Sequence, residues 1–154
     1  MPLEIIIGNH QDKVVVPVSW LTALEEIGSQ AAGMALEVSI DEENSLQHLA
    51  ILEVAMVDDE TSSKVHFDFM EIDGPTDVIT FHHGEIVIGT EVALRQAEEY
   101  GEPLGREILR YFVHGLLHLA GFEDSTESEA SAMEAAQEKI VAALWKGATE
   151  SRLS

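Results

Sequence analysis

The hydrophobic positions in the first half of the chain follow two periods, which predict short strands and one long helix. Residues 4–7 are mostly isoleucine and end at Gly8, so they predict a strand. Residues 19–36 carry apolar side chains at helical spacing and predict a helix. Residues 36–40 alternate apolar and polar side chains, and residues 50–57 are largely apolar, so both predict further strands. The chain is therefore expected to open as strand, helix, strand.

The second half of the chain combines a hairpin pattern with longer helical stretches. Residues 77–82 and 85–89 are strand-like runs joined by a tight turn at Gly84, which predicts a β-hairpin. Helical spacing and capping signals predict helices over residues 62–70, 90–100, 103–120 and, from a cap at Ser125, to about 145. This order of elements predicts an α+β fold, a mixed sheet of about four strands covered by helices.

The length of 154 residues fits a single domain, expected over residues 1–148. The stretch after Gly147, residues 149–154, is expected to be a frayed tail. No apolar stretch approaches the roughly 18 residues needed to cross a bilayer, so neither a membrane nor a secretory route is expected and the protein is expected to be cytoplasmic. The chain has no cysteine, so any metal must be held by His, Asp or Glu.

The charge of the chain is strongly negative and bears on the choice of partner. The formal net charge is -21, from 29 acidic and 8 basic residues. Such a surface repels polyanions at long range and argues against an autonomous, tight nucleic-acid binder, DNA included. The alternative interpretation is that the acidic side chains only form a solvated surface that keeps the protein soluble and indicate no partner.

The helix predicted from Pro103 to about Ala120 carries the most informative polar residues. Its apolar stripe consists of Leu104, Ile108, Phe112, Leu116 and Ala120. On the other side, His114 and His118 lie one turn apart, a spacing that lets two imidazoles converge on one ion. Gly121 favours a left-handed helix end that turns the chain back, which makes Asp124 the expected third ligand.

Two histidines and one carboxylate form a known catalytic zinc set, which leaves a fourth position open for water. The alternative is that the His114 and His118 pair decorates a surface or a core, because this spacing alone is a weak motif. Burial of the helix and the chain-reversing glycine before Asp124 favour the metal site.

The segment 114–124, from His114 to Asp124, closely resembles the signature of the YbeY family, bacterial rRNA maturation factors described as zinc-dependent endoribonucleases. The resemblance extends upstream to residues 75–81, Pro-Thr-Asp-Val-Ile-Thr-Phe, and to the Gly-Glu-Ile strand at residues 84–88. It implies a central metal-binding helix, one Zn²⁺ per chain, precursor ribosomal RNA as substrate, and a role in rRNA maturation and ribosome quality control.

The chain departs from this family pattern at two positions. Asp124 stands where the pattern has a third zinc-binding histidine, and Met70 stands where many members have an arginine. A carboxylate oxygen is an accepted zinc ligand, so the first change is compatible with a metal site. Methionine cannot bind a phosphate, so Arg110 becomes the candidate cation for the cleft, with a solvated position on the helix surface as the alternative.

Hydrolysis also needs a group that accepts a proton from water. Glu85 stands at the acidic position of the strand that resembles the family pattern, so it is the candidate general base. The alternative is that Glu85 is only an exposed charge at the end of the strand. Zinc would lower the pKa of its bound water and polarise a phosphoryl oxygen.

Two other functions compete with the endoribonuclease. A zinc peptidase of the His-Glu-x-x-His type is disfavoured, because Gly115 stands where its general-base glutamate would be. A non-enzymatic ribosome-assembly factor with a structural metal gains support from Met70. For the endoribonuclease, the acidic surface is expected to dock on basic ribosomal proteins, so that a high local concentration of RNA replaces affinity for RNA.

Overall fold

The structure, a computed structural model, describes residues 3–154. Its strands are β1 (Glu4–Asn9), β2 (Ile51–Val57), β3 (Val78–Phe81) and β4 (Glu85–Gly89). Its α-helices are α1 (Val18–Glu37), α2 (Asp59–Met70), α3 (Thr90–Tyr100), α4 (Leu104–Leu119), α5 (Glu127–Leu144) and α6 (Ala148–Arg152). A short 3₁₀ helix, η1 (Leu46–His48), precedes β2.

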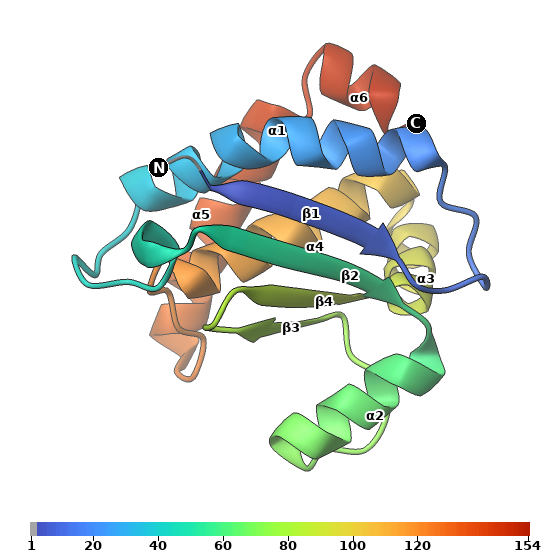
Figure 1. Ribbon diagram of the computed structural model, residues 1–154, viewed down its shortest axis with the longest axis horizontal. Coiled ribbons are helices and arrows are strands. Elements are labelled where there is room, and N and C mark those ends of the chain that lie inside the picture. The colour runs from blue at the N-terminus through green and yellow to red at the C-terminus, as the bar shows by residue number, and fades with distance from the viewer. Residues whose placement is uncertain (1–2) are drawn as a thin grey trace.

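The four strands form one mixed sheet in the order β1-β2-β4-β3. β1 pairs in parallel with β2, and β2 pairs in parallel with β4. β3 and β4 pair antiparallel and form the predicted hairpin. Figure 1 shows α4 running behind the sheet, with α1 and α5 beside it, while α2 projects below β3. The prediction of an α+β fold with a mixed sheet covered by helices is confirmed.

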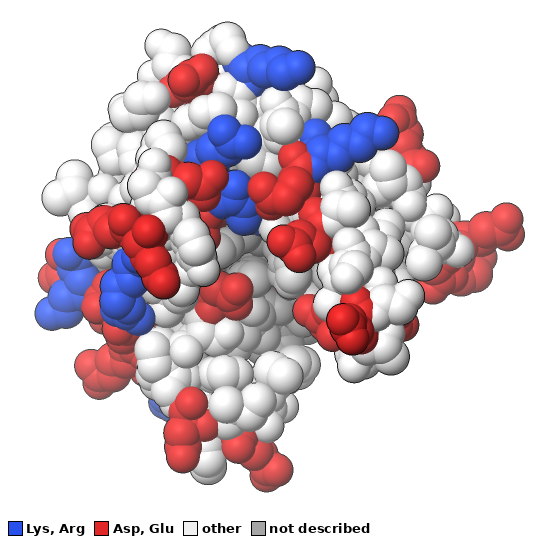
Figure 2. Space-filling view, turned by 180° about the vertical axis from the view of Figure 1, so that it is seen from behind, with Lys and Arg blue, Asp and Glu red and all other residues white. Residues whose placement is uncertain are grey.

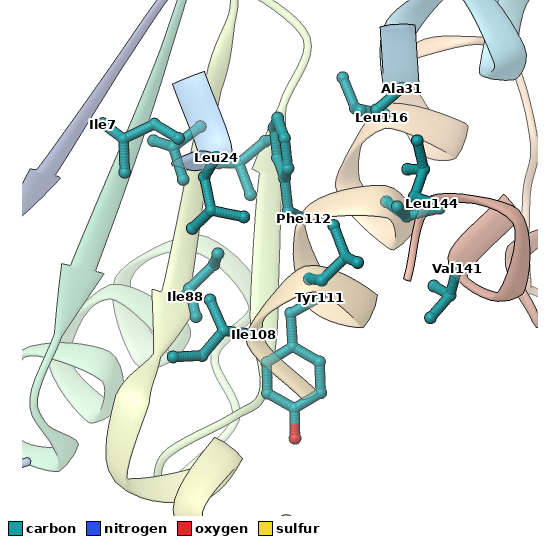
Figure 3. Close-up of a cluster of buried hydrophobic side chains, with 14 of the residues drawn as sticks. Ile7, Leu24, Ala31, Ile88, Ile108, Tyr111, Phe112, Leu116, Val141 and Leu144 are labelled. Atoms are coloured by element: carbon teal, nitrogen blue, oxygen red, sulfur yellow. The ribbon is translucent and has the colours of Figure 1, made fainter. Parts of the chain in front are cut away.

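Helix α4 lies at the centre of the hydrophobic core, and seven of its side chains are completely buried. They are Ile108, Leu109, Phe112, Val113, Leu116, Leu117 and Leu119. Figure 3 shows side chains of α4 between strand residues such as Ile7 and Ile88 and helix residues such as Val141 and Leu144. Burial on nearly all sides holds α4 rigidly, so the polar side chains that it carries are held rigidly as well.

A glycine allows α4 to pack closely on the sheet. A Cβ atom built on Gly115 would lie 2.6 Å from Cδ1 of Ile86 on β4, well inside van der Waals contact. The missing glutamate of the peptidase motif therefore has a structural reason, because any side chain at this position would collide with the sheet.

The predicted strand at residues 36–40 is wrong. Helix α1 continues to Glu37, and the backbone N–H of Val38 still donates to the carbonyl oxygen of Met34. Ala31 and Ala35 are completely buried, so the packing of α1 on the core extends the helix to its last turn. Five residues that alternate apolar and polar are too few to separate a strand from a helix end.

The C-terminal residues form a short helix that packs on the rest of the fold. Residues 148–152 form α6, and Leu153 is only 1% exposed. A Cβ atom built on Gly105 would lie 2.0 Å from the carbonyl oxygen of Leu153, so this segment packs directly on the first turn of α4. Within residues 3–154 no helix is long and apolar enough to cross a membrane.

Candidate metal centre

His114, His118 and Asp124 are brought together at the end of α4. Oδ2 of Asp124 lies 3.8 Å from Nε2 of His114 and 3.5 Å from Nε2 of His118. One candidate ligand atom from each residue lies within 4.8 Å of the other two. Metal–ligand bonds of about 2.0–2.2 Å at tetrahedral angles would place such atoms about 3.4 Å apart. The three side chains therefore form a group that could hold a metal ion.

The end of α4 explains why Asp124 returns to the histidines. Gly121 has φ +103°, a left-handed value that a side chain would strain. The N–H of Gly121 donates to the carbonyl oxygen of His118, and the N–H of Phe122 donates to that of Leu117. This pair of bonds is a Schellman motif, which ends the helix and reverses the chain as predicted from the glycine.

Both imidazoles are oriented through the nitrogen that faces away from Asp124. Nδ1 of His114 lies 2.7 Å from Oε1 of Gln137 on α5, and Nδ1 of His118 lies 3.0 Å from the carbonyl oxygen of Phe122. Both partner oxygens, an amide and a carbonyl, only accept hydrogen bonds, so each Nδ1 must donate. Nε2 of each neutral ring then carries a free lone pair, which is the arrangement that metal-ligating histidines need.

The environment of His118 favours its neutral form. Burial first, and then the neighbouring His114, lower the pKa of His118, while the carboxylate of Asp124 acts in the opposite direction. A neutral imidazole is the form that coordinates a metal.

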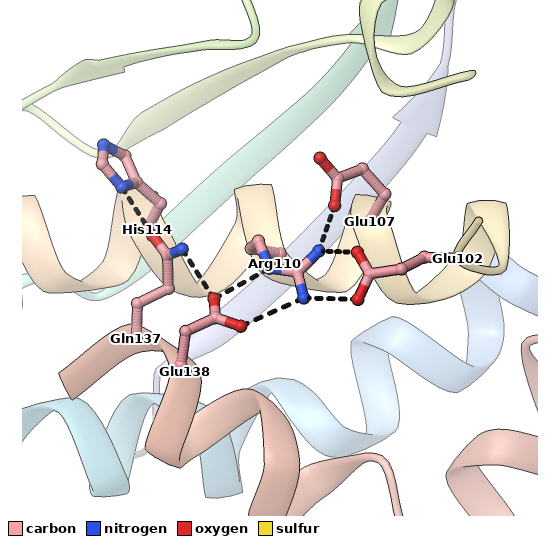
Figure 4. Close-up of polar contacts among 6 residues, drawn as sticks. All are labelled: Glu102, Glu107, Arg110, His114, Gln137 and Glu138. Carbon is pink, nitrogen blue, oxygen red and sulfur yellow. Dashed lines mark hydrogen bonds and ion pairs between the residues drawn. The ribbon is translucent and has the colours of Figure 1, made fainter. Parts of the chain in front are cut away.

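Arg110, the candidate cation of the cleft, is bound to carboxylates and does not offer a free cation to this site. Its Nε and two Nη atoms bond Glu102, Glu107 and Glu138, and these contacts use all five N–H donors (Figure 4). Its side chain is only 14% exposed. Gln137 connects this network to His114, because its amide nitrogen donates to Glu138 while its oxygen accepts from the imidazole.

Glu85 is not brought to the metal-binding group either. Ile86 and Ile88 belong to the core around α4, whereas Val87 packs with Val57 and Ile79 in a separate cluster. Side chains alternate along a strand, so Glu85 lies on the face of Val87, opposite α4. Its carboxylate lies 3.3 Å from Nε2 of His83 at the hairpin turn. The expected general base therefore faces away from the histidines.

A cleft of about 600 Å³ lies beside the group. Its lining includes His114 and Asp124. The other lining residues come from the segment before β3 and from α3, α4 and α5: Pro75, Thr76, Asp77, Val92, Gln96, Glu107, Arg110, Tyr111, Ala130, Met133, Glu134 and Gln137. Figure 2, seen from behind the sheet, shows a hollowed face whose rim carries acidic side chains and, on its upper side, basic ones. Met70, 52% exposed at the end of α2, is not among the lining residues.

The sequence interpretation missed the residues that support the group. Gln137 lies 23 positions from His114 on another helix, and the acceptor at Phe122 is a backbone oxygen. The sequence feature that could have identified Gln137 is its place on α5, where a polar residue follows the buried Met133 by four positions on the face that packs on the core. Tyr111 and Glu107 line the same cleft, and the apolar spacing of the helix does not single them out.

Comparison with known proteins shows the family of the chain. Residues 21–145 match the family model described as Endoribonuclease YbeY. The protein named Endoribonuclease YbeY from Moorella thermoacetica is 33% identical, covering 91% of this chain and 96% of that protein. The protein of the same name from Carboxydothermus hydrogenoformans is 32% identical, covering 90% and 95%. The solution structure of TM1509 from Thermotoga maritima shares the fold, with a TM-score of 0.59 and 24% identity over 92% of this chain and 89% of that one. The resemblance first noted at residues 114–124 is confirmed, and the chain belongs to the YbeY endoribonuclease family.

Proposed function

We propose that this protein is a metal-dependent endoribonuclease that acts on precursor ribosomal RNA in rRNA maturation and ribosome quality control. The observation that carries the proposal is the convergence of two imidazole nitrogens and one carboxylate oxygen beside an open cleft. Membership of a family named for endoribonuclease activity supports the same reaction.

The donor set fits one zinc ion per chain, held by His114, His118 and Asp124. Two nitrogens and one oxygen suit zinc, and no thiolate is available in the chain. When bound, zinc lowers the pKa of a coordinated water and polarises a phosphoryl oxygen.

The residues of the chain supply orientation and proton transfer. Gln137 and the carbonyl of Phe122 hold the two rings with Nε2 directed at Asp124. Glu134 lines the cleft from α5, three residues before Gln137, and is our candidate proton acceptor in place of Glu85. Arg110 acts through Glu138 and Gln137 to position His114 rather than on a phosphate.

The acidity of the surface is consistent with delivery of the enzyme by protein contact. With a net charge of -21, basic ribosomal proteins in the cytoplasm are the favoured docking partners, because their charge complements this surface. Docking would raise the local concentration of RNA at the cleft.

A ribosome-assembly factor with a structural metal is the second candidate function. It is favoured by the lack of a free cation for a phosphate in the cleft, because Arg110 is fully bonded to carboxylates and Met70 replaces the arginine of the family pattern. A phosphate in the cleft would then depend on the metal for its charge compensation.

Cleavage of single-stranded and precursor ribosomal RNA by the metal-loaded, chelated and reloaded protein separates these two functions. The endoribonuclease predicts internal cleavage that stops on chelation and returns with zinc. The assembly factor predicts metal retention without cleavage, and that result would overturn the proposal.

A further inference from the structure

Arg106 on α4 carries a guanidinium group that bonds no acceptor among residues 3–154. The side chain is half-buried, and its Nε is buried without a hydrogen bond. Its Cζ lies 6.0 Å from the centre of the Trp145 ring, a contact with the ring face that leaves the N–H donors free. The other three arginines of the chain all bind carboxylates: Arg95, Arg110 and Arg152. A buried donor without an acceptor costs free energy, so the free donors of Arg106 point to an anionic ligand.

Two exposed lysines lie beside this arginine. Lys146 directly follows Trp145, and Lys139 lies seven positions earlier, a spacing that puts both lysines on the same side of α5 and its C-terminal turn. The ion pairs among the described residues involve neither lysine. Residues 139–149 contain no Asp or Glu, although 29 of the 154 residues of the chain are acidic. Positive charge therefore outweighs negative charge over the last part of α5.

The three cations lie at one end of the cleft. Arg106 precedes Arg110, which lines the cleft, by one helical turn, and it precedes His114 by about 12 Å along the axis of α4. Figure 2 shows basic side chains on the upper side of the hollow. Glu138, the acidic neighbour of Lys139, is bonded to Arg110 through both of its oxygens. The cations are therefore available to a phosphate that flanks the one at the metal centre.

Arginine binds a phosphate through paired N–H groups, and lysines add point charges along a polyanion. We propose that Arg106, Lys139 and Lys146, the α4–α5 patch, bind the phosphate backbone of the RNA substrate and guide it into the cleft. Because the net charge of the chain is -21, the patch gives RNA a local route across a surface that otherwise repels it. This inference rests on the proposed function, since it takes RNA as the substrate.

Binding of a fluorescent single-stranded RNA to the zinc-loaded protein tests the α4–α5 patch. Phosphorothioate linkages keep the charge of the RNA backbone and slow its hydrolysis during the measurement. We expect Arg106→Gln to weaken binding about fivefold at about 0.1 M salt, and the double variant Lys139→Gln, Lys146→Gln to weaken it about 20-fold. The slope of the logarithm of affinity against the logarithm of salt concentration should fall by about 0.7 for each cation removed.

A second double variant, Lys13→Gln with Lys64→Gln, is the matched control. Both of these lysines are exposed and lie outside the patch, so the control removes the same charge as the α5 double variant and should change affinity less than about twofold. The lysine variants alter only exposed side chains, so they test the patch even if Arg106→Gln does not fold. Equal losses in the two double variants, no loss in either, or no RNA binding by the unmodified protein would overturn the inference.

Cleavage and stability of the same variants separate failure of this inference from failure of the proposed function. RNA cleavage by a protein whose RNA binding does not depend on the patch would refute the patch alone, whereas patch-dependent binding without cleavage would refute only the endoribonuclease. The structural alternative is that Arg106 offsets the carboxylates bonded to Arg110. In that case Arg106→Gln would lower the melting temperature and leave RNA binding unchanged, which also overturns the inference.

Discussion

Oε1 of Gln137 lies 2.7 Å from Nδ1 of His114, so the last long helix of the fold, α5, orients a candidate metal ligand on α4. Gln137→Ala should weaken metal affinity about 10–100-fold, because the ring loses the acceptor that sets its tautomer and direction. Gln137→Glu keeps an acceptor at this position and should largely preserve affinity. Competition with a chromophoric zinc chelator measures both variants. Equal affinity of the alanine variant and the unmodified protein would contradict the role of this contact.

The Arg110 network predicts a large effect on stability. Arg110→Met should lower the free energy of unfolding by about 3 kcal/mol, because it leaves the partly buried carboxylates of Glu102, Glu107 and Glu138 without their cation. The matched change Arg95→Met removes an exposed ion pair with Asp59 and should cost about 1 kcal/mol or less. Urea denaturation of the chelated proteins gives both values. Similar small losses for the two variants would argue that Arg110 is not structural.

Substitution by alanine at two helical glycines should change the stability of the protein in opposite directions. Gly115→Ala should destabilise the protein by about 1–3 kcal/mol, since its new methyl group meets Ile86. Gly33→Ala on α1 has no atom within 4 Å of the new group and should stabilise by about 0.5–1 kcal/mol. Thermal unfolding measures both changes. A stable Gly115→Ala variant would show that α4 and β4 are not packed as described.

The position of Glu85 on the opposite face of the sheet predicts that it takes no part in proton transfer. Glu85→Gln should leave the rate constant for RNA cleavage within about twofold, whereas Glu134→Gln should lower it by about 100-fold or more. Single-turnover cleavage at saturating enzyme measures the chemical step for each variant. A large loss in Glu85→Gln alone would restore the general base expected from the sequence.

The local parts of the site could be predicted from the sequence. His114, His118, Gly121 and Asp124 lie within eleven residues on one helix and its C-terminal turn, so helical periodicity and the conformational preference of glycine determine their relative positions. The hairpin at Gly84 could be predicted for the same reason, because a short-range pattern specifies it.

The long-range parts of the site could not be predicted from the sequence. Residues 86–88, after Glu85, are apolar on both faces of the strand, so their pattern does not indicate whether Glu85 lies on the face that meets α4. Two of the three partners of Arg110, Glu102 before α4 and Glu138 on α5, come from segments whose alignment depends on core packing. The same packing extends α1 through the stretch that resembled a strand at residues 36–40.

Parallel measurement of metal content and RNA cleavage in Asp124→Ala, Asp124→His and the unmodified protein tests the central claim most directly. We predict about one zinc per chain and chelator-sensitive cleavage in the unmodified protein, loss of both together in Asp124→Ala, and retention of zinc in Asp124→His, because imidazole also suits zinc at this position. Cleavage by a verified metal-free protein, or full zinc content and activity in Asp124→Ala, would contradict the assignment of His114, His118 and Asp124 as the metal centre of this endoribonuclease.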